Sequence, residues 1–139
     1  MRRVVIDTDL YIDWLNAGRH EAVVFRGGLV KYLSAVVLLE LFAGAFSARD
    51  QKLVGRIAGA FEKAGRLLVP PAHVYEEAGH VLRKLQETWG YNLAGAHSLV
   101  NDALIALSAR SIGATLITRN ERDFVAIQRV RRFRLEVVA

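Results

Sequence analysis

The chain has 139 residues, 53% of them hydrophobic, and a net charge of +5 at pH 7; this composition predicts one domain with its own core and excludes a disordered chain. Because the chain contains no cysteine, disulfide frameworks, thiolate nucleophiles and cysteine-ligated metal sites are excluded. The lack of a long apolar run, and an N-terminus that leads directly into a predicted strand, predict a cytoplasmic protein without a membrane span or signal peptide, while the basic charge allows an acidic partner such as nucleic acid.

A run of β-branched residues near the start of the chain stops at Asp7, which predicts a buried strand that brings a carboxylate to the edge of a sheet. In open α/β sheets, ligands bind beyond the carboxyl ends of the strands.

Ser34 is a suitable N-cap for the apolar helix after it. The elements expected in the first half are a strand at 4–6, helices at 10–15 and 19–26, a strand at 31–35, and helices at 36–46 and 51–64, the last with Asp50 close to its N-cap.

In the second half, strands and helices continue to alternate. Pro70 ends a short apolar strand, and Gly90 and Gly113 are suitable helix stops. The expected elements are a strand at 66–70, a helix at 72–89, a loop at 92–97, a helix at 98–112, a strand at 114–118, a helix at 120–127 and a strand at 133–138. This alternation predicts an α/β fold: one domain over residues 1–139, with a mainly parallel central sheet flanked by helices.

Two acidic residues interrupt apolar helices. Glu40 is the only charge in its predicted helix, and small residues three and four positions later leave space beside it. Asp102 lies on the face of its helix that is expected to pack on the sheet, where a charge is costly unless it is paired or binds a metal. Each has another interpretation, since Glu40 could be a single wet position on a buried helix and Asp102 could be a helix cap.

Asn120 and Asp123 follow the strand that ends at Thr118, on the same side of the predicted sheet as Asp7. Either could instead be an N-cap or an acid of the first helical turn.

Converging carboxylates repel one another unless they are protonated or neutralised by a cation. A site with oxygen ligands alone favours Mg²⁺ or Mn²⁺, and phosphodiester hydrolysis suits such a site.

Four short motifs stand in order along the chain. They are Val4-Val5-Ile6-Asp7-Thr8, then Leu39-Glu40-Leu41 after a short Ser-Ala segment, then Asn101-Asp102-Ala103-Leu104-Ile105-Ala106, and finally Thr118-Arg119-Asn120 with Asp123-Phe124. In order and spacing they resemble the PIN-domain ribonucleases, in particular the VapC-type toxins of prokaryotic toxin–antitoxin pairs. The resemblance covers essentially the whole chain, and the length of the chain agrees with it.

The resemblance implies a magnesium- or manganese-dependent endoribonuclease that cleaves RNA, is commonly a homodimer, and is silenced by a cognate antitoxin whose C-terminal segment occupies the active-site groove. Carried over by position, it assigns metal binding to Asp7, Glu40 and Asp102, with Asp123 as the fourth acid. Some relatives have an acid where this chain has Asn120, so either Asn120 or Asp123 completes the site. The resemblance also assigns supporting roles to Thr8 and Thr118. Asp9 is a further candidate carboxylate, behind the metal ligands.

The densest basic cluster is near the C-terminus, at Arg129, Arg131, Arg132 and Arg134. These side chains could contact RNA phosphates, although keeping an edge strand soluble is the favoured interpretation.

Two rival functions start from the same residues. Asp7 and Asp9 also resemble the nucleophile and acid of haloacid-dehalogenase-type phosphatases, but the later lysine and Gly-Asp motif of those enzymes have no convincing counterpart. The second rival is a non-catalytic PIN-fold module that only binds RNA or a partner, and the intact acids argue against it.

Overall fold

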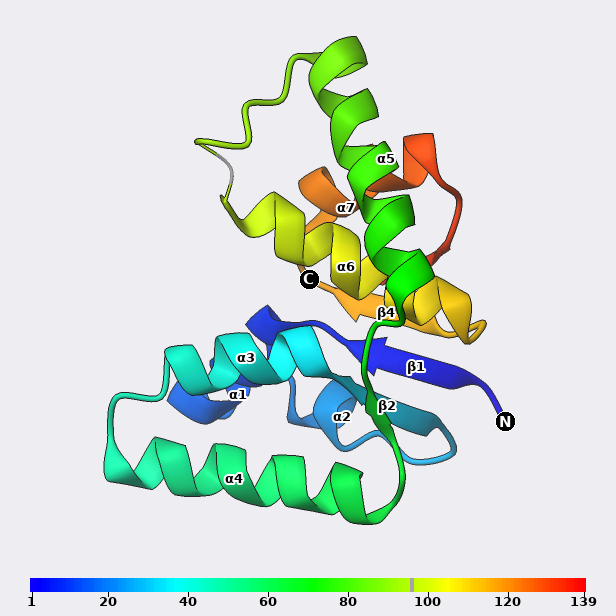
Figure 1. The fold of residues 1–139 in the computed structure, drawn as a ribbon. Coiled ribbons are helices and arrows are strands. Elements are labelled where there is room, and N and C mark those ends of the chain that lie inside the picture. Colours follow the sequence, from blue (N-terminus) through cyan, green and yellow to red (C-terminus); the bar gives the residue numbers. More distant parts are fainter. Residues whose placement is uncertain (96) are drawn as a thin grey trace.

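A five-stranded sheet forms the centre of the chain in the computed structural model, which describes residues 1–95 and 97–139 (Figure 1). Its strands lie in the order β3-β2-β1-β4-β5, and every neighbouring pair is parallel. The predicted α/β fold with a mainly parallel central sheet is therefore confirmed. The strands are β1 (Arg3–Ile6), β2 (Val30–Ser34), β3 (Leu67–Leu68), β4 (Thr115–Thr118) and β5 (Arg134–Val137).

Helices connect the strands and lie on two sides of the sheet. Connections that lead toward β3 run in the opposite direction to those that lead toward β5, and right-handed crossovers then place their helices on opposite faces. Figure 1 shows this division, with α1 to α4 in its lower half and α5 to α7 in its upper half. The helices are α1 (Thr8–Ala17), α2 (Glu21–Val24), α3 (Ala35–Ala43), α4 (Ala48–Lys63), α5 (Ala72–Trp89), α6 (His97–Ser111) and α7 (Glu121–Val130).

Local sequence explains most helix ends. The predicted helix at 72–89 is α5, and Gly90 ends it in the left-handed conformation, with a φ of 68°. Ser34 caps α3 as predicted, because its hydroxyl oxygen accepts the backbone N–H groups of Val36 and Val37. α1 begins at Thr8, before the predicted residue 10, because the Asp7 side chain accepts the N–H of Thr8 and acts as the N-cap.

The connection between α3 and α4 differs from the prediction. α3 ends at Ala43 instead of residue 46, and α4 begins at Ala48 instead of residue 51. The Ser47 hydroxyl accepts the N–H of Asp50 at 3.0 Å, so Ser47 is the N-cap and Asp50 lies in the first turn. The loop predicted at 92–97 also ends early, since α6 begins at His97; its residue Ala96 lies outside the described residues.

The carboxyl ends of β1 and β4 lie side by side at the centre of the sheet. Their pairing aligns Ile6 with Ile117, and the N–H of Asp7 continues it by donating to the carbonyl of Ile117 at 2.9 Å. The helices that follow these two strands leave toward opposite faces, and this point of an open sheet is where ligands bind. Of the helices described, none is long and apolar enough to cross a membrane.

Candidate active site

Asp7 lies at the carboxyl end of β1, and only 5% of its surface is exposed. One carboxylate oxygen accepts the N–H of Thr8 at 2.8 Å, and the other accepts the hydroxyl of Thr118 at 2.7 Å. Burial, and then the neighbouring charge of Asp9, raise the pKa of Asp7 from 3.8 to about 7, even though both hydrogen bonds lower it. The ionised form of Asp7 is therefore poorly stabilised by the protein itself.

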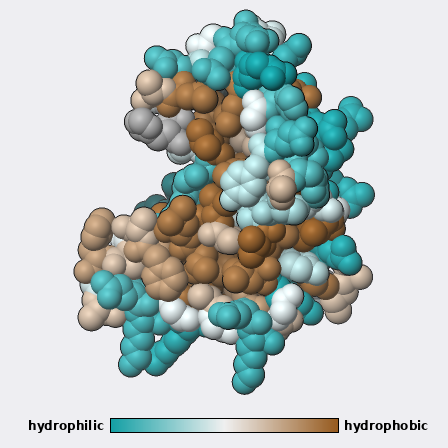
Figure 2. Space-filling model, viewed as in Figure 1, coloured by the Kyte–Doolittle hydropathy of each residue, from teal (hydrophilic) through white to brown (hydrophobic). Residues whose placement is uncertain are grey.

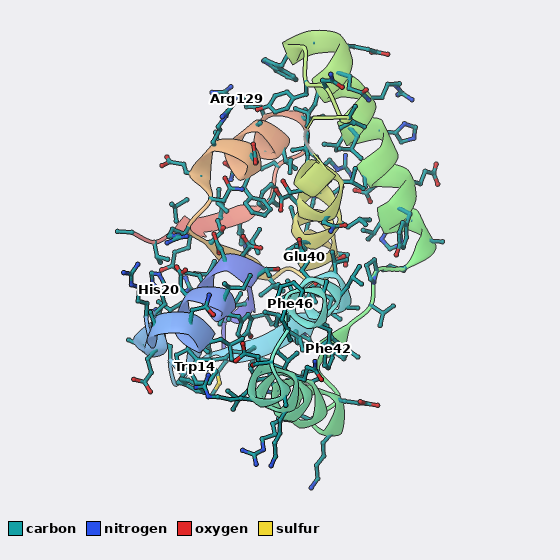
Figure 3. The ribbon with its side chains drawn as sticks, turned by 90° about the vertical axis from the view of Figure 1, so that its left-hand side faces the viewer. Trp14, His20, Glu40, Phe42, Phe46 and Arg129 are labelled. Carbon is teal, nitrogen blue, oxygen red and sulfur yellow. The ribbon has the colours of Figure 1, made fainter. Side chains whose placement is uncertain are left out.

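Glu40 extends from α3 into the space below α6 (Figure 3). The hydroxyl of Thr8 donates to its Oε1 at 2.7 Å, and the side-chain amide of Asn101 donates to its Oε2 at 3.5 Å. Two other helices therefore hold this half-buried carboxylate in place. Glu40 is part of a polar group at the end of the sheet and not an isolated wet position on a buried helix.

Asp102 lies inside α6, well after its first residue, so the interpretation of Asp102 as a helix cap is wrong. It is 6% exposed, and its Oδ2 has no hydrogen-bond partner within the described part of the chain. Burial raises the pKa of Asp102 from 3.8 to about 8, with further contributions from the charges of Asp7, Glu40, Asp123 and Asp9. Asp102 is therefore within electrostatic range of the other predicted acids.

Asn120 and Asp123 interact with each other at the start of α7. The Asn120 side chain accepts the N–H of Asp123 at 3.4 Å and donates to Asp123 Oδ2 at 3.2 Å. The backbone N–H of Asn120 donates to the Thr118 hydroxyl at 2.9 Å. Asn120 is therefore the N-cap of α7 and Asp123 lies in its first turn, as the alternative interpretation of the sequence proposed. A residue at the start of α7 can still belong to the site, because the charge of Asp123 contributes to the raised pKa of Asp102.

A network that the sequence did not predict lies beside Asp9. Arg119 forms a 2.8 Å ion pair with Asp13, and His20 Nε2 lies 3.1 Å from the same oxygen of Asp13. Burial raises the pKa of Asp9, whereas Arg119 lowers it. The only sequence signal for this network is the position of Arg119 between Thr118 and Asn120 in the fourth motif. Asn101, which precedes Asp102 in the third motif, is a further residue of the site that the sequence did not predict.

The C-terminal arginines do not form one surface. Arg129 lines a cavity next to Asp123, whereas Arg131 is held by Glu77 at 3.3 Å. Arg132 and Arg134 line a different cavity, which also includes Gly113. Gly113 precedes β4, so these two arginines lie at the end of the parallel sheet opposite to Asp7. Of the four, Arg129 is the one beside the acidic residues.

The donor set suits a hard divalent cation. The acidic side chains supply oxygen atoms alone, burial and then neighbouring carboxylates raise the pKa values of Asp7 and Asp102, and one oxygen of Asp102 has no partner among the described residues. As the side chains stand, no three of the described histidine, aspartate or glutamate residues are grouped closely enough to hold an ion. Asp7 and Glu40 are instead bound by threonine hydroxyls.

Most of the chain matches a known domain family. The sequence profile of the PIN domain matches residues 4–130. The chain belongs to the PIN domain family. The matched region includes every acidic residue discussed above, and membership in this family removes the haloacid-dehalogenase alternative. No curated protein matches the chain significantly.

Solved structures share the fold of this PIN domain. VapBC2 from Rickettsia felis, solved with a DNA fragment from its promoter, has 20% sequence identity and a TM-score of 0.66, covering 99% of both chains. FitAcB from Neisseria gonorrhoeae has 22% identity and a TM-score of 0.69, covering 95% of both chains. VapBC-5 from Mycobacterium tuberculosis, from a family of toxin–antitoxin systems, has 19% identity and a TM-score of 0.62, covering 99% of this chain and 100% of its own.

Proposed function

We propose that this PIN domain is a divalent-metal-dependent endoribonuclease that acts as the toxin of a type II toxin–antitoxin pair. The observation that carries the proposal is the buried Asp102, whose pKa rises to about 8 beside Asp7, Glu40 and Asp123. A buried group of like charges does not stabilise a protein. A cation that neutralises these charges removes their repulsion and gives the carboxylates a role as metal ligands.

Asp7, Glu40, Asp102 and Asp123 are the residues that would hold Mg²⁺ or Mn²⁺. When bound, such an ion orients the scissile phosphate, promotes attack by water and stabilises the leaving oxygen. The protein contributes by fixing the carboxylates: Thr118 bonds Asp7, Thr8 bonds Glu40, and Asn120 bonds Asp123. These neutral partners position each acid without supplying the positive charge that an ion pair would.

Two observations support the toxin role and its partners, a cognate antitoxin and a second copy of the chain. First, the solved relatives include proteins named as toxin–antitoxin complexes. Second, α3 and its end expose large apolar side chains: Leu39 is 62% exposed, Phe42 45% and Phe46 89%. Figure 2 shows apolar residues gathered on this face, above the charged side chains that project from α4. Exposed apolar area of this kind commonly marks a protein–protein interface.

The test is cleavage of a labelled single-stranded RNA by purified protein freed of any antitoxin. We expect cleavage with Mg²⁺ or Mn²⁺, none with excess chelator, and none from Asp7→Asn or Asp102→Asn. Asp50→Asn, an aspartate in the first turn of α4 outside the acidic group, is the matched control and should cleave like the parent. Circular dichroism of each variant confirms that the fold is retained.

Two results would overturn the proposal. If Asp102→Asn cleaves as fast as the parent, Asp102 does not belong to the catalytic group. If the parent binds RNA but leaves it intact with Mn²⁺, the chain is the non-catalytic binding module that the sequence also allowed.

A further inference from the structure

A cavity of about 650 Å³ lies next to the acidic site, between the C-terminal end of α5 and one face of α7. Its volume is within the range of about 300–1,000 Å³ that is usual for sites of small organic molecules. Asp123 belongs both to its wall and to the group of acids that act on Asp102. The cavity therefore opens beside the place where the proposed reaction occurs.

Two arginines form one side of this cavity. Arg122 and Arg129, with Ala126 between them, follow the helical spacing of one face of α7, and all three line the cavity. At 1.5 Å per residue, the two arginines are about 10 Å apart along the helix axis. Figure 3 shows Arg129 on α7, well separated from the apolar side chains of α3.

Within the described part of the chain, the charges of these arginines are not paired. Arg131, in the same segment, is held by Glu77. Neither Arg122 nor Arg129 forms an ion pair or a side-chain hydrogen bond with another described residue, and both are exposed. Exposed guanidinium groups with no protein partner are suited to phosphate oxygens.

Two aromatic rings form the other side. Trp89, the last residue of α5, is 43% exposed, and Tyr91 is partly buried against the core; both line the cavity. A large apolar ring exposed beside arginines provides a surface on which a nucleobase can stack, with the backbone phosphate on the cationic side. An apolar peptide would leave the arginines unpaired, and a purely acidic peptide would make no use of the rings.

We infer that this cavity is a subsite for single-stranded RNA, in which a base flanking the scissile phosphate stacks on Trp89 and Tyr91 while Arg122 and Arg129 bind adjacent phosphates. The inference rests on the proposed function and deepens it. The physical need is clear, because a strand that crosses a group of carboxylates is repelled there and requires positive charge on a neighbouring wall.

Trp89 provides a direct probe. The chain has two tryptophans, and the other, Trp14, packs edge-on against Phe25 at 5.0 Å, so Trp14→Phe keeps an aromatic ring there and leaves Trp89 as the sole emitter. In an Asp7→Asn background with chelator, a short oligoadenylate RNA is titrated and Trp89 emission is recorded. We expect quenching by the single strand and little by an RNA duplex, whose bases are already stacked.

Substitutions then test the arginines. Arg122→Ala and Arg129→Ala should each weaken RNA binding about tenfold. Each should also reduce the steepness of the plot of log binding constant against log salt concentration by about 0.7, the value for one phosphate contact on a single strand. Arg49→Ala, an exposed arginine of α4, is the matched control and should bind like its background. Quenching that is unchanged in both variants, or quenching by an oligoglutamate peptide but not by RNA, would overturn the inference.

Cleavage kinetics separate this inference from the proposed function. In the otherwise unaltered enzyme, the Arg122→Ala/Arg129→Ala double variant should raise KM at least tenfold while kcat stays within about threefold of the parent, because a flanking contact adds binding energy that is equal in the ground and transition states. A parent that cleaves RNA with a double variant of unchanged KM refutes the subsite alone. A parent that never cleaves RNA, yet shows Arg-dependent quenching of Trp89, refutes the nuclease function and supports the subsite.

Discussion

The hydroxyl of Thr118 donates a 2.7 Å hydrogen bond to Oδ2 of Asp7 across the pair of strands β1 and β4. Thr118 is fully buried, and its oxygen also accepts the N–H of Asn120. One side chain thus connects the first acid of the site to the segment that carries the last. The bond also lowers the pKa of Asp7 against the effects of burial and of neighbouring charge.

Thr118→Val tests this connection, since valine has nearly the same shape but no hydroxyl. We expect a loss of stability of about 1–3 kcal/mol, because two buried polar groups lose a partner, and a loss of activity of about 10- to 100-fold, as is typical when a supporting group of a metal site is removed. Urea unfolding and RNA cleavage are the measurements. Thr115→Val, at the far end of the same buried strand, is the matched control; equal activities for the two variants would contradict the assigned role.

The stability of the metal-free protein should fall as the pH rises from about 4 to 8. The pKa values of Asp7 and Asp102 rise from 3.8 to about 7 and about 8 on folding, so the folded state binds more protons than the unfolded state in this range. Their contribution to stability is therefore complete below about pH 3.8 and is lost as the pH passes through 7 and 8. Thermal unfolding in chelator across this range is the measurement.

The same experiment has two internal checks. Asp102→Asn removes one of the two titrating groups and should flatten the decline. Mn²⁺ should raise Tm more at pH 8.5 than at pH 6, because the carboxylates must lose their protons to bind it. A decline of the same slope in parent and variant would show that Asp102 is not the group responsible.

The fourth position of the site is decided by comparing Asn120 with Asp123. Asn120→Ala removes the N-cap of α7 and should cost about 1 kcal/mol of stability, whereas Asn120→Asp keeps a capping oxygen and should retain that stability. Asp123→Ala should leave stability nearly unchanged and abolish most cleavage. Urea unfolding and the rate at several Mn²⁺ concentrations distinguish these effects. A fully active Asp123→Ala variant would transfer the fourth position to Asn120.

The apolar face of α3 should control assembly and not folding. Phe46 is 89% exposed, so Phe46→Ser should change the free energy of unfolding by less than about 0.5 kcal/mol. If this face joins two copies of the chain, the mass measured by light scattering should fall from that of a dimer to that of a monomer. Val137→Ser, on the edge strand β5 and 41% exposed, should leave the mass unchanged. A dimer that survives Phe46→Ser together with Leu39→Ser would place the contact elsewhere.

The sequence predicted the fold well, for local reasons. A β-branched run before Asp7 indicates a buried strand, and a single carboxylate in an apolar helix indicates a place where charge is needed. The helix at 72–89 was predicted to the residue, because its apolar spacing and Gly90 are signals that lie next to each other in the chain. Boundaries with several competing caps, as between α3 and α4, were predicted less well.

The tertiary structure alone decided which residues surround the acids. Glu40 is bound by Thr8 across 32 positions and Asp7 by Thr118 across 111 positions, and pairings of that separation have no local signal in a single sequence. It also separated the C-terminal arginines, because α7 directs Arg129 toward Trp89 while the following turn carries Arg134 to the opposite end of the sheet. Sequence patterns thus indicated which charged residues lie at strand ends and within helices. The packing of distant helices determined which of these residues meet, because contact depends on the path of the whole backbone.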